Sequence, residues 1–178
     1  MSTRLVILGL LRNQPLHGYE IKKMIEEHMG DWTDIAFGSI YFALGKLADE
    51  GFVDMIATER QGRRPSRSIY EITPAGRAEF LNLLRQVWTR PQRQHFILDL
   101  GLFFIDSLPR EEVADYLAQK LTWLEAVRDH LAGHKDENMA RGEVPRVAGA
   151  IFDHSLAHLE AELEWTREVL DQVLSGVY

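Results

Sequence analysis

A change of hydrophobic period at Gly51 constrains the fold of this 178-residue chain more than any other feature. Before Gly51, apolar residues recur every three or four positions, which predicts three helices. After it, "FVDMIATER" and "SRSIYEIT" alternate apolar and polar residues, which predicts two short strands. The loop "QGRRPS" between them is rich in turn-forming residues, so the pair is expected to form a β-hairpin.

A fourth helix is predicted directly after the hairpin. Thr73 is a good N-cap residue, and Pro74 suits the first position of a helix. The order helix, helix, helix, hairpin, helix is that of a winged helix-turn-helix. The period breaks at "TRPQRQ", residues 89–94, so we expect this domain to occupy residues 1–90.

Residues 91–178 predict a second domain made of helices. An apolar helix is expected around Phe96 to Ile105, and a longer one begins at "LPREEV". A polar connector containing Gly133 and Gly142 then leads to a last helix. The predicted fold class is therefore mainly α with a small β-hairpin: an N-terminal winged helix-turn-helix and a C-terminal helical dimerisation domain.

The last helix has the most regular apolar spacing in the chain. The steps alternate between 4 and 3 over three repeats, which is typical of a helix that packs against another helix. The predicted heptad seam consists of Phe152, Leu156, Leu159, Leu163 and Leu170, with Thr166 and Val173 in register. The partner helix could belong to the same chain. However, a second apolar row of Ile151, Trp165 and Val169 is more than one neighbour would cover, so we predict a homodimer.

The charge of the chain is unevenly distributed. The net charge is -7, yet residues 1–90 hold 12 Lys and Arg against 11 Asp and Glu, while residues 91–178 hold 8 against 16. The first half can therefore present a locally positive surface to nucleic acid. The absence of cysteine excludes disulfides and thiolate chemistry. No apolar run reaches the roughly 18 to 20 residues that cross a bilayer, and no signal peptide is recognisable, so we expect a cytoplasmic protein without a membrane partner.

The outward side of the third helix, predicted from a cap at Ser39 to a stop at Gly51, is unusual. Surface helices ordinarily carry Glu and Lys there, whereas this one carries Ser39, Tyr41, Gly45 and Lys46. An exposed Tyr near a mid-helix Gly indicates a surface that another molecule approaches closely. We interpret that molecule as double-stranded DNA.

Five segments resemble the PadR family of bacterial transcriptional regulators. They are "ILGLL", "HGYEIKKMIEE", "GSIYFALGKLADEGFV", "IYEITPAGRAEF" and, in the second half, "LEAELEWTREVL". The length and paired C-terminal helices look like the longer branch of the family, whose C-terminal domain resembles that of virulence-gene activators. The resemblance implies a homodimer that represses transcription and releases its operator when a small, often aromatic, molecule binds. The chain departs from the family at Phe42, where Pro is frequent, and at Gly45 or Leu47, where a second basic residue often stands.

The third helix is predicted to lie in the major groove of DNA. Ser39, Ile40 and Tyr41 near its start would reach base edges, and Lys46 further along would contact a phosphate. One such domain would bind weakly at physiological salt. A dimer would place two of these helices about 34 Å apart, which predicts an inverted-repeat operator.

Two further groups of residues are predicted to contact the DNA backbone. The hairpin loop and the residues that flank it contain four arginines, suited to phosphate or to a minor groove: Arg60, Arg63, Arg64 and Arg67. On the second helix, Tyr19, Lys22 and Lys23 would contact phosphates, as the family resemblance also implies.

Other functions remain alternatives. An enzyme is disfavoured, because the chain has no nucleophile elbow, phosphate-binding glycine loop or HExxH helix. A metal-responsive sensor could use His130 with His134, or His154 with His158, since each pair is spaced by one helical turn. Chance produces such pairs readily among seven histidines, so no metal or other cofactor is predicted. The third alternative is a dimeric scaffold that uses the hairpin for protein contacts.

A small aromatic effector would need a site lined by aromatic and polar groups. We expect it where the two halves of the chain meet, and the residues predicted for it are Trp88, Trp123, His154 and Trp165, with Trp32 as a further candidate.

Overall fold

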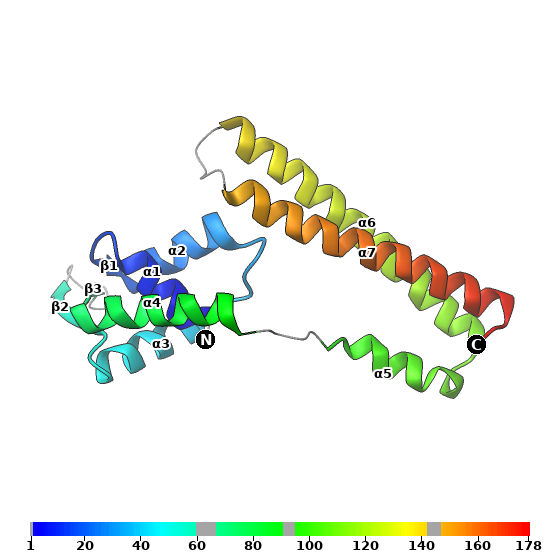
Figure 1. Ribbon diagram of the computed structural model, residues 1–178, viewed down its shortest axis with the longest axis horizontal. Helices are drawn as coiled ribbons and strands as arrows, with labels where there is room; N and C mark the ends of the chain where they lie inside the picture. The colour runs from blue at the N-terminus through cyan, green and yellow to red at the C-terminus, as the bar shows by residue number, and fades with distance from the viewer. Residues whose placement is uncertain (1, 60–66, 91–94, 142–146) are drawn as a thin grey trace. The chain divides into compact units, whose positions relative to one another are not determined.

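The computed structural model describes residues 2–59, 67–90, 95–141 and 147–178 (Figure 1). The chain divides into two compact units, Met1–Arg93 and Gln94–Tyr178. Each unit has its own hydrophobic core.

The N-terminal unit contains four helices and a small antiparallel sheet. The helices are α1 (Ser2–Leu11), α2 (Gly18–Met29), α3 (Phe37–Asp49) and α4 (Pro74–Thr89). The strands are β1 (Leu16–His17), β2 (Val53–Glu59) and β3 (Arg67–Ile72), paired in the order β1-β3-β2. The predicted hairpin is confirmed, but β1 escaped prediction because two residues are too few to show an alternating pattern.

The core of the N-terminal unit forms where α1 packs against α3 and α4. The apolar stripes of the helices meet there, and each strand adds one or more inward residues. Its fully buried members are Ile7, Leu8, Leu11, Ile21, Ile40, Leu44, Leu47 and Val53. This core fixes the orientation of α3 because the whole inward stripe of α3 is part of it.

The start of α3 differs from the sequence prediction. The N-cap position is Ala36, which makes no side-chain cap, and Ser39 lies within the first turn. The Ser39 hydroxyl donates to the Ala36 carbonyl at 2.6 Å instead of accepting a backbone N–H. The predicted cap at Ser39 is therefore wrong by three positions. The predicted stop is correct, since Gly51 directly follows the C-cap residue and has a φ of +74°.

The C-terminal unit is entirely helical in its described part. It contains α5 (Ile97–Phe103), a 3-10 turn at Ile105–Ser107, α6 (Arg110–Arg141) and α7 (Val147–Ser175). The long helices α6 and α7 run side by side along most of their length (Figure 1). The polar connector predicted at Gly133 is wrong, because α6 continues through this glycine to Arg141.

The heptad seam of α7 packs inside the chain. Phe152 and Leu163 are buried within this one chain, and Leu156, Leu159 and Leu170 are partly buried. The second row is also covered: Val169 is buried with Ala114 and Leu117 of α6, and Trp165 packs against that cluster. The prediction that the seam is the dimer contact is therefore wrong for Phe152 and Leu163, since α6 already occupies that side.

Candidate nucleic-acid interface

The outward face of α3 carries aromatic residues, glycines and a lysine. Its exposed members are Phe37, Gly38, Tyr41, Phe42, Gly45 and Lys46. Ile40 does not belong to this face: its side chain is only 1% exposed and lies in the core, so the prediction that it reaches base edges is wrong. Ser39 is half-buried, and its hydroxyl is engaged by the Ala36 carbonyl.

Tyr41 connects α3 to the start of α2. Its ring packs so closely on Gly18 that a Cβ atom at Gly18 would lie 2.7 Å from the Tyr41 Cε1. The ring also meets Phe37 edge-on, with centroids 5.0 Å apart. Nearby, Tyr19 is exposed and stacks on His17 with a centroid separation of 5.4 Å. Tyr41 therefore holds the two helices of the helix-turn-helix together while its outer part remains exposed.

Lysines flank this aromatic surface. Lys46 Nζ lies 5.0 Å from the Phe42 ring centroid, and Lys22 Nζ lies 4.9 Å from that of Phe37. Lys22 also pairs with Glu26 at 3.2 Å, one turn along α2. A solvent-exposed pair of this kind is worth only about 0.3–0.5 kcal/mol. A phosphate could therefore replace Glu26 as the partner of Lys22 at small cost.

The hairpin loop lies mostly outside the described residues. Arg60, Arg63 and Arg64 fall in the range 60–66, and their predicted role stays a prediction. The backbone of Arg67 begins β3 and pairs with Glu59 of β2. Strands β2 and β3 therefore hold the two residues that flank the loop, Glu59 and Arg67, side by side.

The residues predicted for an effector belong to two different units of the chain. Trp88 belongs to α4 of the N-terminal unit and is exposed, whereas Trp123, His154 and Trp165 belong to the C-terminal unit. Trp123 is exposed on α6, while His154 and Trp165 line two adjoining hollows.

The larger hollow has a volume of about 530 Å³. Its lining is mixed: Phe96, Val127, Leu131, His154, Ser155, His158, Leu159, Ala161 and Glu162. The Nε2 atoms of His154 and His158 lie 3.2 Å apart. Glu162 and Phe96 also line the second hollow, of about 180 Å³, together with Trp165. This part of the C-terminal unit can accept a planar apolar group at one side and a polar group at the histidines.

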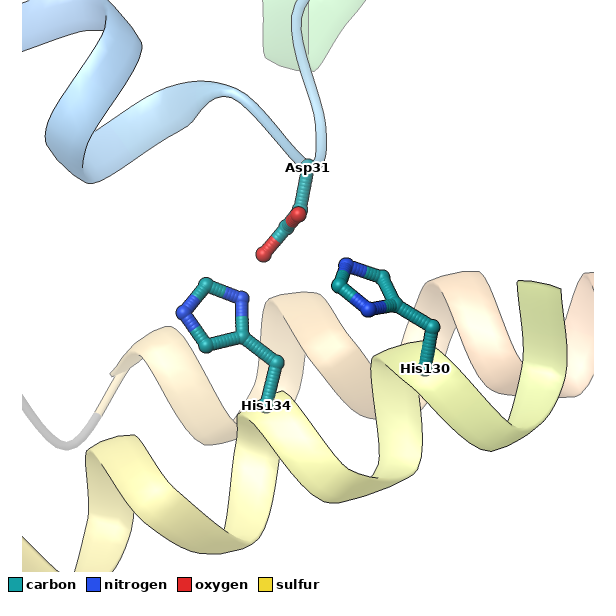
Figure 2. Close-up of side chains that lie close together, drawn as sticks. All are labelled: Asp31, His130 and His134. Carbon is teal, nitrogen blue, oxygen red and sulfur yellow. The ribbon is translucent and has the colours of Figure 1, made fainter. Parts of the chain in front are cut away.

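The second histidine pair lies on α6. Figure 2 shows the rings of His130 and His134 one turn apart on the same side of this helix. Their centroids are 5.9 Å apart, and His134 also meets Phe152 edge-on at 5.8 Å.

Known proteins resemble this chain over nearly its whole length. Residues 7–82 match the model of the transcriptional regulator PadR-like family. The negative transcriptional regulator PadR of Bacillus subtilis is 30% identical over 173 residues, which cover 94% of each protein. The chain belongs to the PadR-like family of transcriptional regulators.

Solved structures of PadR-family proteins have the same fold. B. subtilis PadR in complex with operator DNA has a TM-score of 0.78 and 27% identity, covering 97% of this chain and 99% of that one. The same protein in complex with p-coumaric acid has a TM-score of 0.76 and 26% identity, with the same coverage. The virulence activator AphA of Vibrio cholerae, 18% identical with a TM-score of 0.74, shares the fold over 97% of this chain and 98% of its own. The predicted winged helix-turn-helix is confirmed.

Membership in the PadR family bears on the alternative function of an enzyme. A transcriptional regulator is not an enzyme class, which agrees with the lack of a catalytic motif in the sequence. Among the described helices, none is both long and apolar enough to cross a membrane.

For several residues of this PadR-family chain, only the structure indicates a part in the interface or in the hollow. Phe37 and Phe42 belong to the exposed face of α3, and Phe96 and His158 line the larger hollow. For Phe42, its outward position on the helical wheel could have indicated this role from the sequence. No sequence pattern indicates the hollow, because residues from three separate segments line it.

Proposed function

We propose that the chain is a homodimeric repressor that binds an inverted-repeat operator and releases it when a small aromatic acid binds. The observation that carries this proposal is the outward face of α3, where aromatic rings, bare glycine backbone and Lys46 are presented together. It is supported by the relative from B. subtilis, a negative regulator whose structures contain operator DNA in one case and p-coumaric acid in another.

In this proposal α3 enters the major groove. Tyr41 and Phe42 face the base edges, and Lys46 contacts a phosphate. Tyr19 and Lys22 of α2 contact the backbone, and the loop arginines Arg63, Arg64 and Arg67 contact phosphate or the minor groove. The side chain of Ile40 serves the core instead.

Replacing Lys46 by alanine tests the phosphate contact. We expect Lys46→Ala to weaken operator binding on the order of ten-fold at physiological salt, because each dimer loses two phosphate contacts. The slope of log affinity against log salt concentration should fall by about 2, and scrambled DNA should be affected equally. Fluorescence anisotropy over a salt series measures both quantities. Lys135→Ala, which removes a lysine paired with Asp153 in the C-terminal unit, is the matched control. An unchanged slope for Lys46→Ala would contradict the contact.

The dimer contact in this proposal is the apolar surface of α5. This helix has seven residues, all of them described, and none is buried. Ile97 is 86% exposed and Phe103 is 78% exposed, and Leu100 lies between them on the same side. So short a helix is not stable in water without a covering surface. A second copy of the chain supplies that cover, and it also supplies the second recognition helix that an inverted repeat requires.

The effector site in this proposal is the larger hollow. An aromatic ring would lie against Phe96, Leu131 and Leu159, and the carboxylate would accept hydrogen bonds from His154 and His158. Of the residues predicted from the sequence, His154 lines the larger hollow and Trp165 lines the adjoining smaller one, whereas Trp88 and Trp123 line neither.

Alanine at His154 or His158 should weaken effector binding, so that more effector is needed to release the DNA. We expect p-coumaric acid to release the operator from the unmodified protein, and at least ten times more acid to be needed for either variant, because each loses a charge-assisted hydrogen bond. Operator affinity without acid should be unchanged. A titration of acid into the protein–operator complex measures both values.

The other histidine pair provides the matched control for this titration. His130→Ala and His134→Ala should respond to the acid as the unmodified protein does. Equal responses to the acid from all four histidine variants would contradict the larger hollow as the effector site. Release by zinc instead of the acid would favour the metal-responsive alternative.

A further inference from the structure

We propose that Phe42 reads one thymine in each operator half-site by contacting the 5-methyl group of the base. This inference rests on the proposed function, since it requires α3 to lie in the major groove.

Phe42 takes no part in the hydrophobic core formed by the described residues. Its side chain is 67% exposed, and the core beneath α3 is filled by Ile40, Leu44 and Leu47. A large apolar ring exposed to water at this position neither stabilises the core nor favours solubility. The neighbouring Tyr41 is different, because its ring packs on Gly18 and holds α2 against α3. Of the two adjacent aromatic residues, Phe42 therefore leaves the larger part of its side chain to a partner molecule, 67% against 43% for Tyr41.

The surroundings of Phe42 let a flat surface approach closely. Gly38 precedes it by one helical turn and Gly45 follows it by one, so all three lie on one outward stripe. Apart from the backbone of α3 itself, no described atom lies within 4 Å of a Cβ built on either glycine. Neither glycine is thus required by packing within the chain. Phe42 therefore lies between two positions at which no side chain covers the backbone of α3.

The chemistry beside the ring indicates which partner fits. Lys46 Nζ lies 5.0 Å from the Phe42 ring centroid, so a positive charge accompanies the apolar surface. The complementary partner presents an apolar group close to a negative charge. In the major groove the thymine methyl is the apolar group among the base edges, and phosphates border the groove. Phe42 and Lys46 match this pair of features.

Replacement of thymine by deoxyuridine tests the contact because it removes only the 5-methyl group. The probe is a duplex selected from random-sequence DNA by the unmodified protein, together with copies carrying deoxyuridine at one thymine at a time. At one thymine of each half-site we expect about four-fold weaker binding, and about fifteen-fold when both half-sites are changed, the value of one buried methyl-sized group per site. Phe42→Ala should bind the thymine and uracil duplexes equally, with an unchanged salt slope. Phe42→Leu should retain a thymine preference.

Three results would overturn the inference. The unmodified protein could bind all deoxyuridine duplexes as tightly as the parent, or Phe42→Ala could keep the thymine preference. In both cases the sequence preference of the protein survives and only the role of Phe42 fails. If no sequence is enriched from the random pool, the proposed function itself fails, and this inference fails with it.

Discussion

The double variant Ile97→Asp/Phe103→Asp is expected to be a monomer that binds its operator at least a hundred-fold more weakly than the unmodified protein. Both side chains stand on the uncovered surface of α5. Two carboxylates buried without partners in an apolar contact would each cost several kcal/mol, more than such a contact can offset. Loss of the second subunit removes the effective concentration that links two half-sites, worth about 10² to 10⁴ in affinity. Sedimentation analysis and DNA titration on the same samples measure the two effects.

Two controls separate the α5 surface from other surfaces. Trp123→Asp places one carboxylate on an exposed aromatic position of α6 and should leave the dimer intact. Leu163 of α7 is fully buried within one chain. Leu163→Ala should therefore destabilise the C-terminal unit by about 2–5 kcal/mol without producing a folded monomer. If Ile97→Asp/Phe103→Asp remained dimeric, or if Leu163→Ala gave a folded monomer, the dimer contact would be assigned to the heptad seam of α7 instead of α5.

The sequence predicted the architecture of the N-terminal unit because its local signals agree. The inward stripe of α3 lies in the core as expected, and Thr73 caps α4 by accepting the Gly76 N–H at 3.0 Å. Ser39 misled because a serine hydroxyl can also donate, and here it donates to a carbonyl one turn back. Gly133 misled because one glycine costs a helix only about 1 kcal/mol, which a 32-residue helix with a packed face tolerates.

The candidate sites were less predictable because periodicity does not identify partners. The heptad spacing of Phe152 and Leu163 shows that α7 packs on a helix, but not whether that helix belongs to the same chain. The apolar residues of α5 have the composition of a core segment, yet Ile97 and Phe103 are exposed. Ile40 misled for the opposite reason, since its place near the start of the third helix suggested contact with bases although its period assigned it to the core.

Gly76→Ala is expected to destabilise the N-terminal unit by about 3 kcal/mol or more, since it forces an atom into space that is already filled. Gly76 lies in the first turn of α4, and a Cβ atom there would stand 2.0 Å from the Phe52 carbonyl oxygen and 2.9 Å from Ile72 Cγ1. The carbonyl cannot retreat freely, because it accepts the Thr73 N–H at 3.1 Å. Relief therefore requires α4 to separate from the turn between α3 and β2. Urea unfolding followed by circular dichroism measures the loss.

Gly45→Ala supplies the matched control, and it tests the interface at the same time. Gly45 also lies in a helix, but a Cβ atom there meets no described atom within 4 Å outside the backbone of α3. Alanine should therefore stabilise α3 by about 0.5–1 kcal/mol, the ordinary difference between the two residues in a helix. If bare backbone at Gly45 allows DNA to approach, this more stable protein should bind its operator more weakly. A gain in both stability and affinity would show that the glycine serves neither packing nor DNA contact. Equal destabilisation by Gly76→Ala and Gly45→Ala would contradict the close packing at Gly76.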